Sequence, residues 1–108
     1  MDAVSVQITG YVDEHFPGFV SCALRDAHGR TWQFVDKVPI FSLADLTGGS
    51  VYPQPGVIRC QVVSRSVDAA GRALVRVDTS TPDGVESTDG NTIFDVFAEQ
   101  LAEVARDG

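Results

Sequence analysis

The stretch PGFVSCALRDAHGRTWQFVD, residues 17–36, decides the fold because the chain contains a second version of it. The counterpart is PGVIRCQVVSRSVDAAGRALVRVD, residues 55–78. In both copies a cysteine follows the proline by five positions, and the last aspartate follows the aspartate of an Asp-Ala-x-Gly motif by ten. The first arm is four residues longer in the second copy, which we expect to lengthen one strand without changing the unit. The repetition predicts two similar β-hairpins, which either an ancestral duplication or shared turn chemistry explains.

Alternating side chains and turn residues support this prediction. In the first copy Val20, Cys22 and Leu24 alternate with the opposite face of the strand, and a period of two is typical of a half-buried strand. The Asp-Ala-x-Gly motif puts aspartate at the start of a type I turn and glycine where a left-handed conformation closes a hairpin. The Pro-Gly pair that opens each copy is also turn chemistry. We therefore expect further turns at Pro17-Gly18 and Pro55-Gly56.

Two further strands are expected outside the repeat. Val4, Val6 and Ile8 alternate with polar residues and predict a first strand over about residues 3–12. Residues 92–97 are rich in β-forming side chains, which favours a sixth strand that ends near Val96.

Two short helical segments are expected as well. Residues 42–46 suit one helical turn with Ser42 as N-cap and Asp45 in the first turn. A C-terminal helix is expected over about residues 98–105. Because Ile93, Phe97 and Leu101 also fit a helical stripe, helix is the alternative for residues 92–97.

The expected fold is therefore all-β and mainly antiparallel. It is a small six-stranded barrel or compact roll built on the two hairpins, with a short C-terminal helix. A chain of 108 residues suits one domain spanning residues 1–108. Closure of the barrel stays open.

The composition favours a soluble, cytoplasmic protein. No run of about eighteen apolar residues occurs, so no membrane-spanning helix is expected. Asp2 stands where a secretory signal would carry a basic residue. In a reducing compartment Cys22 and Cys60 are expected as buried thiols, and a disulfide between them is the alternative in an exported protein.

Charge divides the chain into two parts. Residues 1–77 carry seven acidic and seven basic side chains, whereas residues 78–108 carry eight acidic side chains and one arginine. The net charge of −7 therefore lies entirely in the last third. Such a field attracts basic partners and repels phosphate backbones and anionic lipids, so neither a nucleic acid nor a membrane is expected as a partner.

This charge distribution predicts a non-enzymatic interaction module that binds a basic protein through its acidic C-terminal region. A bacterial immunity protein that neutralises a basic toxin, or a regulatory protein, would have this character. No cofactor is expected, and the oligomeric state is left open. The residues expected to contact the partner are Asp83, Glu86, Asp89, Asp95 and Glu99.

The loop at residues 83–91 supports an alternative, the binding of a small ligand or divalent cation. Its oxygen-bearing side chains suit a hard cation such as Ca²⁺, although their spacing does not match an EF-hand loop. Turn formation explains the same composition. The candidate ligands are Asp83, Glu86, Asp89 and Asn91.

Catalysis has weaker support. A thiol–imidazole pair or a pair of carboxylates could act in catalysis. However, both cysteines lie on the apolar side of their predicted strands, and the histidines lie in a link and at a hairpin tip, so no catalytic residue is expected. The pairs considered are Cys22 with His15, Cys60 with His28, and Asp36 with Asp78.

A basic stripe on the second hairpin completes the set of candidate features. Such a stripe can track a nucleic-acid backbone, but no stacking aromatic accompanies it. We expect its arginines to pair with acids of the C-terminal third instead. The stripe consists of Arg59, Gln61, Arg65, Arg72 and Arg76.

Overall fold

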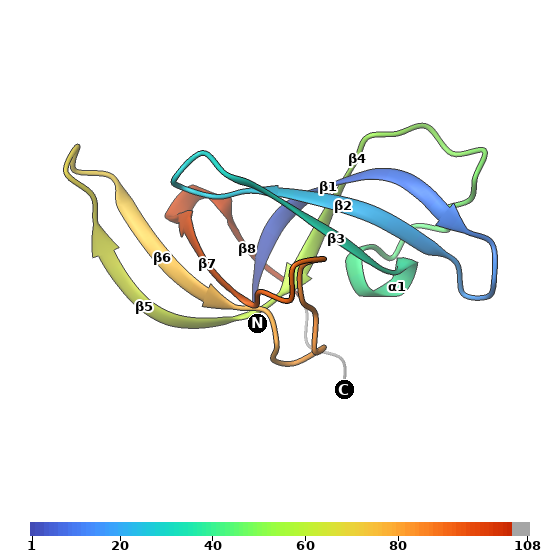
Figure 1. Cartoon of the computed structure of the whole chain (residues 1–108). Helices are drawn as coiled ribbons and strands as arrows, with labels where there is room; N and C mark the ends of the chain where they lie inside the picture. The colour runs from blue at the N-terminus through green and yellow to red at the C-terminus, as the bar shows by residue number, and fades with distance from the viewer. Residues whose placement is uncertain (105–108) are drawn as a thin grey trace.

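The computed structural model describes residues 1–104, which form eight strands, one short α-helix and one 3-10 turn (Figure 1). All strand pairs in this range are antiparallel. The elements are β1 (Asp2–Asp13), β2 (Phe19–Arg25), β3 (Thr31–Lys37), α1 (Val38–Phe41), β4 (Gln54–Arg59), β5 (Gln61–Val67), β6 (Ala73–Asp78), β7 (Ile93–Phe97), η1 (Ala98–Gln100) and β8 (Leu101–Glu103).

β1 is the central strand of the first sheet, whose order is β3-β2-β1-β4. Its side chains alternate as the sequence predicts, with Val4, Val6 and Ile8 buried and the residues between them exposed. The second half of β1 pairs with β2 and the first half with β4. Because β4 and β8 both pair with Ala3 and Val4, β8 lies along the edge of β1 opposite to β4. β1 therefore holds three strands in place.

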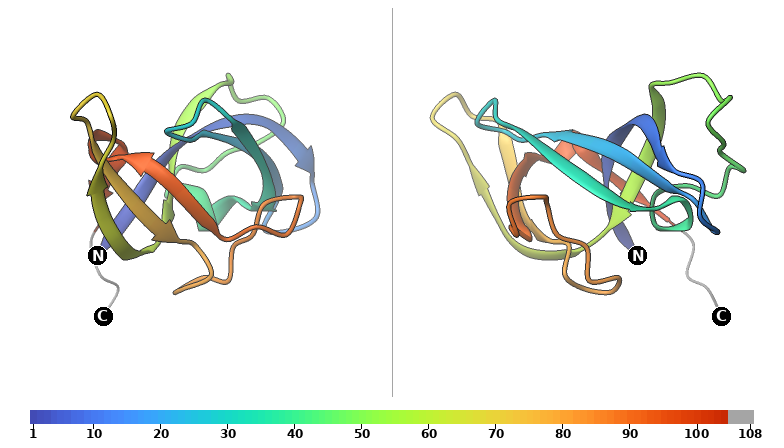
Figure 2. Two further views of the ribbon diagram at one scale, coloured as in Figure 1. Left: turned by 60° about the vertical axis from the view of Figure 1, so that its left-hand side comes forward. Right: turned by 45° about the vertical axis from the view of Figure 1, so that its right-hand side comes forward.

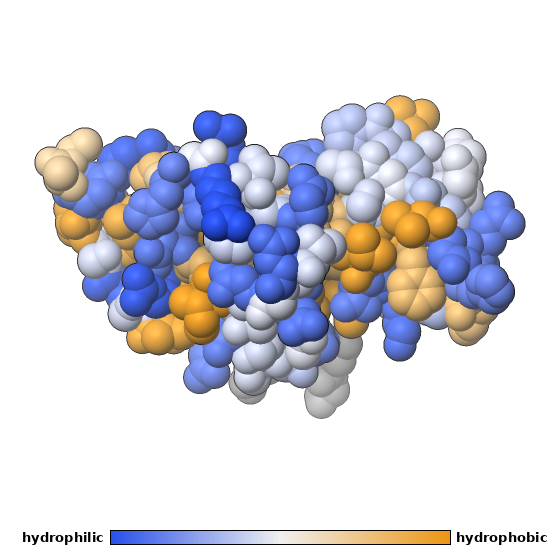
Figure 3. Space-filling model, viewed as in Figure 1, coloured by the Kyte–Doolittle hydropathy of each residue, from blue (hydrophilic) through white to orange (hydrophobic). Residues whose placement is uncertain are grey.

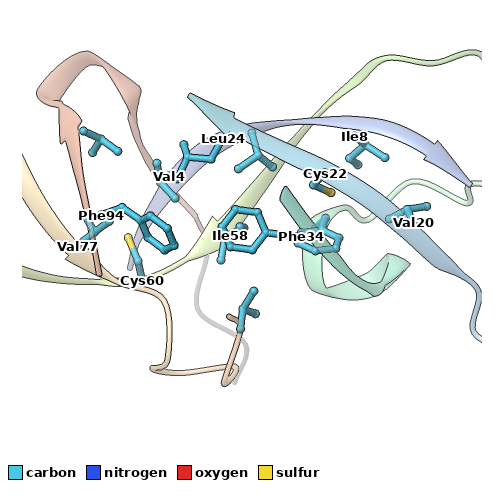
Figure 4. Packing of buried hydrophobic residues seen from close by; sticks show 14 of the residues in the cluster. Val4, Ile8, Val20, Cys22, Leu24, Phe34, Ile58, Cys60, Val77 and Phe94 are labelled. Atoms are coloured by element: carbon cyan, nitrogen blue, oxygen red, sulfur yellow. The ribbon is translucent and has the colours of Figure 1, made fainter. Parts of the chain in front are cut away.

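The second sheet has the order β5-β6-β7, and both sheets contribute to one core. Phe94 of β7 packs edge-to-face on Trp32 and Phe34 of β3, with ring centroids 5.2 and 5.6 Å apart, an arrangement that aromatic rings favour. Figure 4 shows Phe94 and Val77 of the second sheet beside side chains of the first. The core is thus enclosed between the sheets, as the views in Figure 2 show.

The prediction of a mainly antiparallel β protein is confirmed, but the prediction of a six-stranded barrel is not. The strands described between residues 1 and 104 number eight and form two sheets that do not close on each other. The difference arises because the chain between Gln54 and Val67 is divided between the sheets, and because β8 is an additional strand.

Both predicted hairpins are present. β2 pairs with β3 from Phe19↔Lys37 to Arg25↔Thr31, and β5 pairs with β6. The closing glycines have the expected left-handed conformation, with φ of +82° at Gly29 and +83° at Gly71. The Asp-Ala-x-Gly motif therefore forms the same turn twice.

The sequence suggested that the longer first arm of the second copy is one strand, but the structure divides it into two. β4 ends at Arg59 and pairs with β1, whereas β5 begins at Gln61 and pairs with β6. Cys60 lies between them, and its N–H donates to the carbonyl oxygen of Asp2. The four extra residues thus let one extended segment serve two sheets.

The turn predicted at Pro55-Gly56 is wrong for the same reason. Both residues lie inside β4, where Pro55 pairs with Gln7 and Gly56 with Val6. A Cβ placed on Gly56 would come within 2.9 Å of the Ile8 side chain and 3.1 Å of the Phe41 carbonyl oxygen. Glycine is therefore needed here for close packing of backbone and side chains. The turn predicted at Pro17-Gly18 is confirmed, since Gly18 has φ of +88°.

The helical turn predicted at residues 42–46 is also wrong, because the helix lies just before it. Pro39 stands in the first turn of α1, where its missing N–H has no helical acceptor to lose. Val38 and Phe41 bury their side chains. Ser42 ends the helix, with its N–H donating to Val38 and its Oγ accepting from the N–H of Ala44.

The C-terminal helix predicted over residues 98–105 is replaced by η1 and β8. The Gln100 side chain accepts the N–H of Phe97 and donates to the Arg25 carbonyl oxygen, which turns the chain back toward β1. Residues 101–103 then pair with the first residues of β1. The strand alternative for residues 92–97 is confirmed by β7; residue 105 lies outside the described residues.

Candidate functional site

The acidic residues predicted to bind a partner are largely engaged with arginines of the same chain. Asp83 accepts from Arg59, with 2.9 Å between Oδ2 and Nε and 2.5 Å between Oδ1 and Nη2. Asp89 accepts from Arg30, with 3.0 Å between Oδ2 and Nη2. Asp83 has a side chain that is only 13% exposed, so it is poorly placed to meet a partner.

Asp95 and Glu99 also pair with arginines of the same chain. Asp95 accepts from Arg76 at 2.8 Å and lies 3.1 Å from Nε2 of His28. The hydrogen bond from Arg76 lowers the pKa of Asp95 to about 2, and the contact with His28 acts in the same direction. Glu99 pairs with Arg72, whose guanidinium also stacks on Phe97. The prediction that hairpin arginines pair with C-terminal acids is therefore confirmed for Arg59, Arg72 and Arg76.

The loop at residues 83–91 is held by its own hydrogen bonds. Val85 is fully buried and anchors the loop in the core, while Thr79 donates its hydroxyl hydrogen to the Val85 carbonyl oxygen at 2.7 Å. The side-chain amide of Asn91 donates to the Ile93 carbonyl oxygen. Among residues 1–104, no three His, Cys, Asp or Glu side chains lie close enough to hold a metal ion together. Glu86 and Asp89 are both exposed acids of this loop, and of the two Asp89 pairs with Arg30.

The two cysteines considered for catalysis lie in the hydrophobic core. Cys22 and Cys60 are buried free thiols. Burial raises their pKa values to about 12 and about 11, with smaller contributions from Asp36 and Asp2 respectively. Such thiols stay protonated at neutral pH and are poor nucleophiles.

The histidines and the two repeat aspartates also have other contacts. His15 is exposed and bonds Asp13 through Nδ1, and His28 bonds Asp95. Asp36 lies in β3 of the first sheet and accepts the N–H of Lys37. Asp78 lies in β6 of the second sheet and accepts the N–H of Ser80. Neither of the two thiol–imidazole pairs considered, nor the carboxylate pair, forms a contact among these described interactions.

Another surface, which sequence reasoning did not find, lies at the opposite end of the first sheet from the hairpin tip. Here the β1–β2 link (residues 14–18), α1 and the connector (residues 42–53) meet around Tyr11. A Cβ on Gly18 would lie 2.4 Å from the Tyr11 hydroxyl, and a Cβ on Gly48 would lie 3.6 Å from the ring. The N–H of Val38 donates to Gly18. We call this surface the connector end.

Large apolar side chains are exposed at the connector end. Phe16 and Leu43 are almost completely exposed, and three more apolar residues are at least 47% exposed. Figure 3 shows apolar surface on the right-hand part of the molecule, where Figure 1 places α1 and the connector. The five residues are Val12, Phe16, Val35, Leu43 and Val51. They come from three separate stretches of the sequence. The only indication of this surface in the sequence is the presence of large apolar residues within turn-rich segments.

The carboxylates of the connector end form no ion pair with an arginine among residues 1–104. Residues 12–18 and 35–53 contain four acids, one lysine and one histidine. Asp13 pairs with the exposed His15, while Glu14, Asp36 and Asp45 form no ion pair with another described residue. The connector end is therefore both apolar and negatively charged.

A shallow groove adjoins this surface. It has a volume of about 250 Å³ and is lined mainly by apolar residues of α1, the residues after it and β4. Pro39, Ile40, Leu43 and Val57 are among them, and Arg59 is the one charged residue that residues 1–104 contribute to the lining. The groove shows that the surface near α1 is hollowed as well as apolar.

Comparison with protein families, curated proteins and solved structures finds no match for this chain. None of the helices between residues 1 and 104 has the length and apolar character needed to cross a bilayer.

Proposed function

We propose that this protein is a non-enzymatic interaction module that binds a basic protein partner, and that the connector end is the docking surface. The observation that carries the proposal is the exposure of Phe16 and Leu43 on segments whose acids Glu14, Asp36 and Asp45 form no ion pair with a described residue. Exposed apolar clusters rimmed by polar groups are typical of protein-binding surfaces. The proposed partner is thus still a basic protein, but its proposed binding site is the connector end and not the C-terminal acids.

Charge complementarity identifies the partner's chemistry. A partner with apolar side chains could cover Phe16 and Leu43 while its lysines or arginines meet Glu14, Asp36 and Asp45. These contacts would increase the association rate and orient the complex. Neutralisation of a basic toxin and control of a basic regulatory protein are both consistent with such a surface.

The C-terminal acids support this role less well. A partner would have to displace Arg30, Arg72 or Arg76 from an existing ion pair before it could bind Asp89, Glu99 or Asp95. The pairs of Asp89 and Glu99 are exposed and contribute little stability, whereas the Asp95 side chain is only 23% exposed and is the least accessible of the three. Their net charge still contributes to long-range attraction of a basic protein.

Two variants with the same change in net charge test the location of the site. The first carries Glu14→Gln, Asp36→Asn and Asp45→Asn, and the second carries Glu86→Gln, Asp89→Asn and Glu99→Gln. Both are used as bait in the lysate of the source organism at low salt and at about 0.5 M salt, where screening is strong. A third bait carries Phe16→Ser and Leu43→Ser.

We expect one basic protein to bind the native chain and the second variant at low salt, and to be lost with the first and third variants. Isothermal titration of the purified partner then measures the affinity. Loss with the second variant alone would place the site on the C-terminal acids. The same background with every bait would contradict the interaction proposal.

The alternative, binding of a cation or small ligand at residues 83–91, is tested by thermal melting with Ca²⁺ and Mg²⁺. A ligand specific for the folded state raises the melting temperature. An unchanged melting temperature at millimolar cation would exclude a divalent-cation site of useful affinity.

A further inference from the structure

The second sheet has one covered edge and one open edge. At the β7 edge, the N–H of Ala27 from the first hairpin tip donates to the Asp95 carbonyl oxygen at 2.8 Å. At the other edge β5 pairs with β6 and with no other described strand. Figures 1 and 2 show the β5–β6 hairpin projecting beyond the rest of the molecule.

β5 has the properties of a strand that can accept another strand. Every residue from Val63 to Val67 is exposed, with Val63 55% and Val67 66% exposed. The register shift lies between Val62 and Ser64, so pairing with β6 is regular from Ser64 onward. The exposed segment contains no proline, which would remove a backbone N–H from the edge.

Arg65 is the one charged residue of this strand, and it distinguishes the possible occupants. It forms no ion pair with another described residue, whereas Arg30, Arg72 and Arg76 all do. Residues 61–78 contain three arginines and two aspartates, so the hairpin is locally basic in a chain of net charge −7. A carboxylate directly opposite Arg65 on an added strand would form a favourable cross-strand ion pair.

A second copy of the chain fits this edge poorly. The segment VSRSV, residues 63–67, reads the same in both directions. The antiparallel register that matches valine with valine and serine with serine therefore places Arg65 opposite Arg65 of the other copy. Like charges directly opposite each other destabilise a strand pair, and two chains of net charge −7 also repel.

We propose that β5 is a second docking site, which binds an extended segment of a partner protein by strand addition and selects a segment with an acidic residue opposite Arg65. Backbone hydrogen bonds would supply affinity and the cross-strand charge pair would supply selectivity. This site is separate from the connector end, so either proposal can fail without the other.

The test uses two synthetic peptides, acetyl-Ser-Thr-Val-Glu-Val-Thr-Ser-amide and the same peptide with lysine in place of glutamate. Binding to the full chain is followed by amide chemical shifts and by hydrogen exchange of residues 63–67. We expect the glutamate peptide to bind about three- to tenfold more tightly than the lysine peptide. Protection should increase at the β5 amides.

Two charge-reversed variants complete the design. Arg65→Glu should reverse the order of the two peptides. Arg25→Glu changes the net charge equally, but Arg25 lies in β2, between β1 and β3, and this variant should keep the native order. Equal binding of both peptides, binding that leaves the β5 amides unprotected, or no binding at millimolar peptide would each overturn the proposal. Concentration-dependent dimerisation of the free chain with protection at β5 would show that a second copy occupies the edge instead.

Discussion

The two hairpins have the same turn motif but very different surroundings. In the first, Asp26 is buried and its carboxylate accepts three hydrogen bonds, from the N–H groups of His28 and Arg30 and from the Trp32 indole. In the second, Asp68 accepts the two equivalent N–H groups, of Ala70 and Arg72, at a more exposed position.

The difference continues beyond the turn. The first tip reaches the second sheet through Ala27, while the second tip projects away from the core. A local motif therefore specifies the shape of a hairpin, and tertiary contacts decide how much that hairpin contributes to stability.

The largest expected effect on the free energy of unfolding comes from replacing each of the two turn aspartates, one at a time. Asp26→Ala leaves three donors without an acceptor at a buried site and should lower the free energy of unfolding by about 3 kcal/mol. Asp68→Ala should cost about 1 kcal/mol because water can reach the released N–H groups. Urea unfolding measures both. Equal losses would show that the surroundings of the turns do not matter.

The next largest effect is a difference in the stability cost of alanine at two glycines, Gly56 inside β4 and Gly71 in a hairpin turn. Gly56→Ala should cost about 2 kcal/mol because the new Cβ would overlap with Ile8 and approach Phe41. Gly71→Ala meets no atom within 4 Å and should cost about 1 kcal/mol through its left-handed backbone. Thermal melting compares the variants. A neutral Gly56→Ala would mean that β1 and α1 can move apart easily.

Acid should weaken the contact between the two hairpins. The pKa of Asp95 is lowered in the folded chain to about 2, so its ion pairs stabilise the fold above the unfolded pKa of about 3.9 and lose that contribution as the pH falls toward 2. We expect about 1 kcal/mol from this carboxylate, given its partial exposure. Asp95→Asn should lower stability at pH 7 and flatten the loss between pH 4 and pH 2. An unchanged slope would assign the acid sensitivity to other carboxylates.

The smallest expected difference concerns the matched cysteines. Burial raises the pKa of both Cys22 and Cys60, so both thiols should react with iodoacetamide at pH 8 far more slowly than in the unfolded chain. Mass spectrometry of Cys22→Ser and Cys60→Ser gives the rate at each remaining thiol. Rapid labelling of Cys60 alone would show that the chain opens where it passes between the sheets.

The features that depend on neighbouring residues were predictable from the sequence. Strand alternation in β1 and the turns at Gly29 and Gly71 follow from local chemistry, and the structure has them. The features that depend on distant partners were not predictable. Nothing near Gly56 indicates that it packs on Ile8, and nothing near Leu101 indicates an open edge of β1 beside Asp2.

The candidate sites divide in the same way. Charge counting anticipated that the second hairpin's arginines would meet C-terminal acids, because opposite charges in excess on one small domain tend to pair. It did not anticipate that pairing would reduce the number of acids left for a partner. The connector end was not predictable because the β1–β2 link and the connector, which carry Phe16 and Leu43, approach Tyr11 only in the folded chain.

The position of β1 between β4 and β8 also constrains the order in which the chain can be completed during synthesis. β1, β2 and β3 are made first and can pair as they emerge. Residues 2–4, however, pair with residues 101–103, so β1 cannot gain β8 as a neighbour until residues 101–103 have been translated. Pairings between such distant residues also slow folding. The start of β1 therefore waits longer for β8 than for β4, and until then that edge of a central strand lacks its partner.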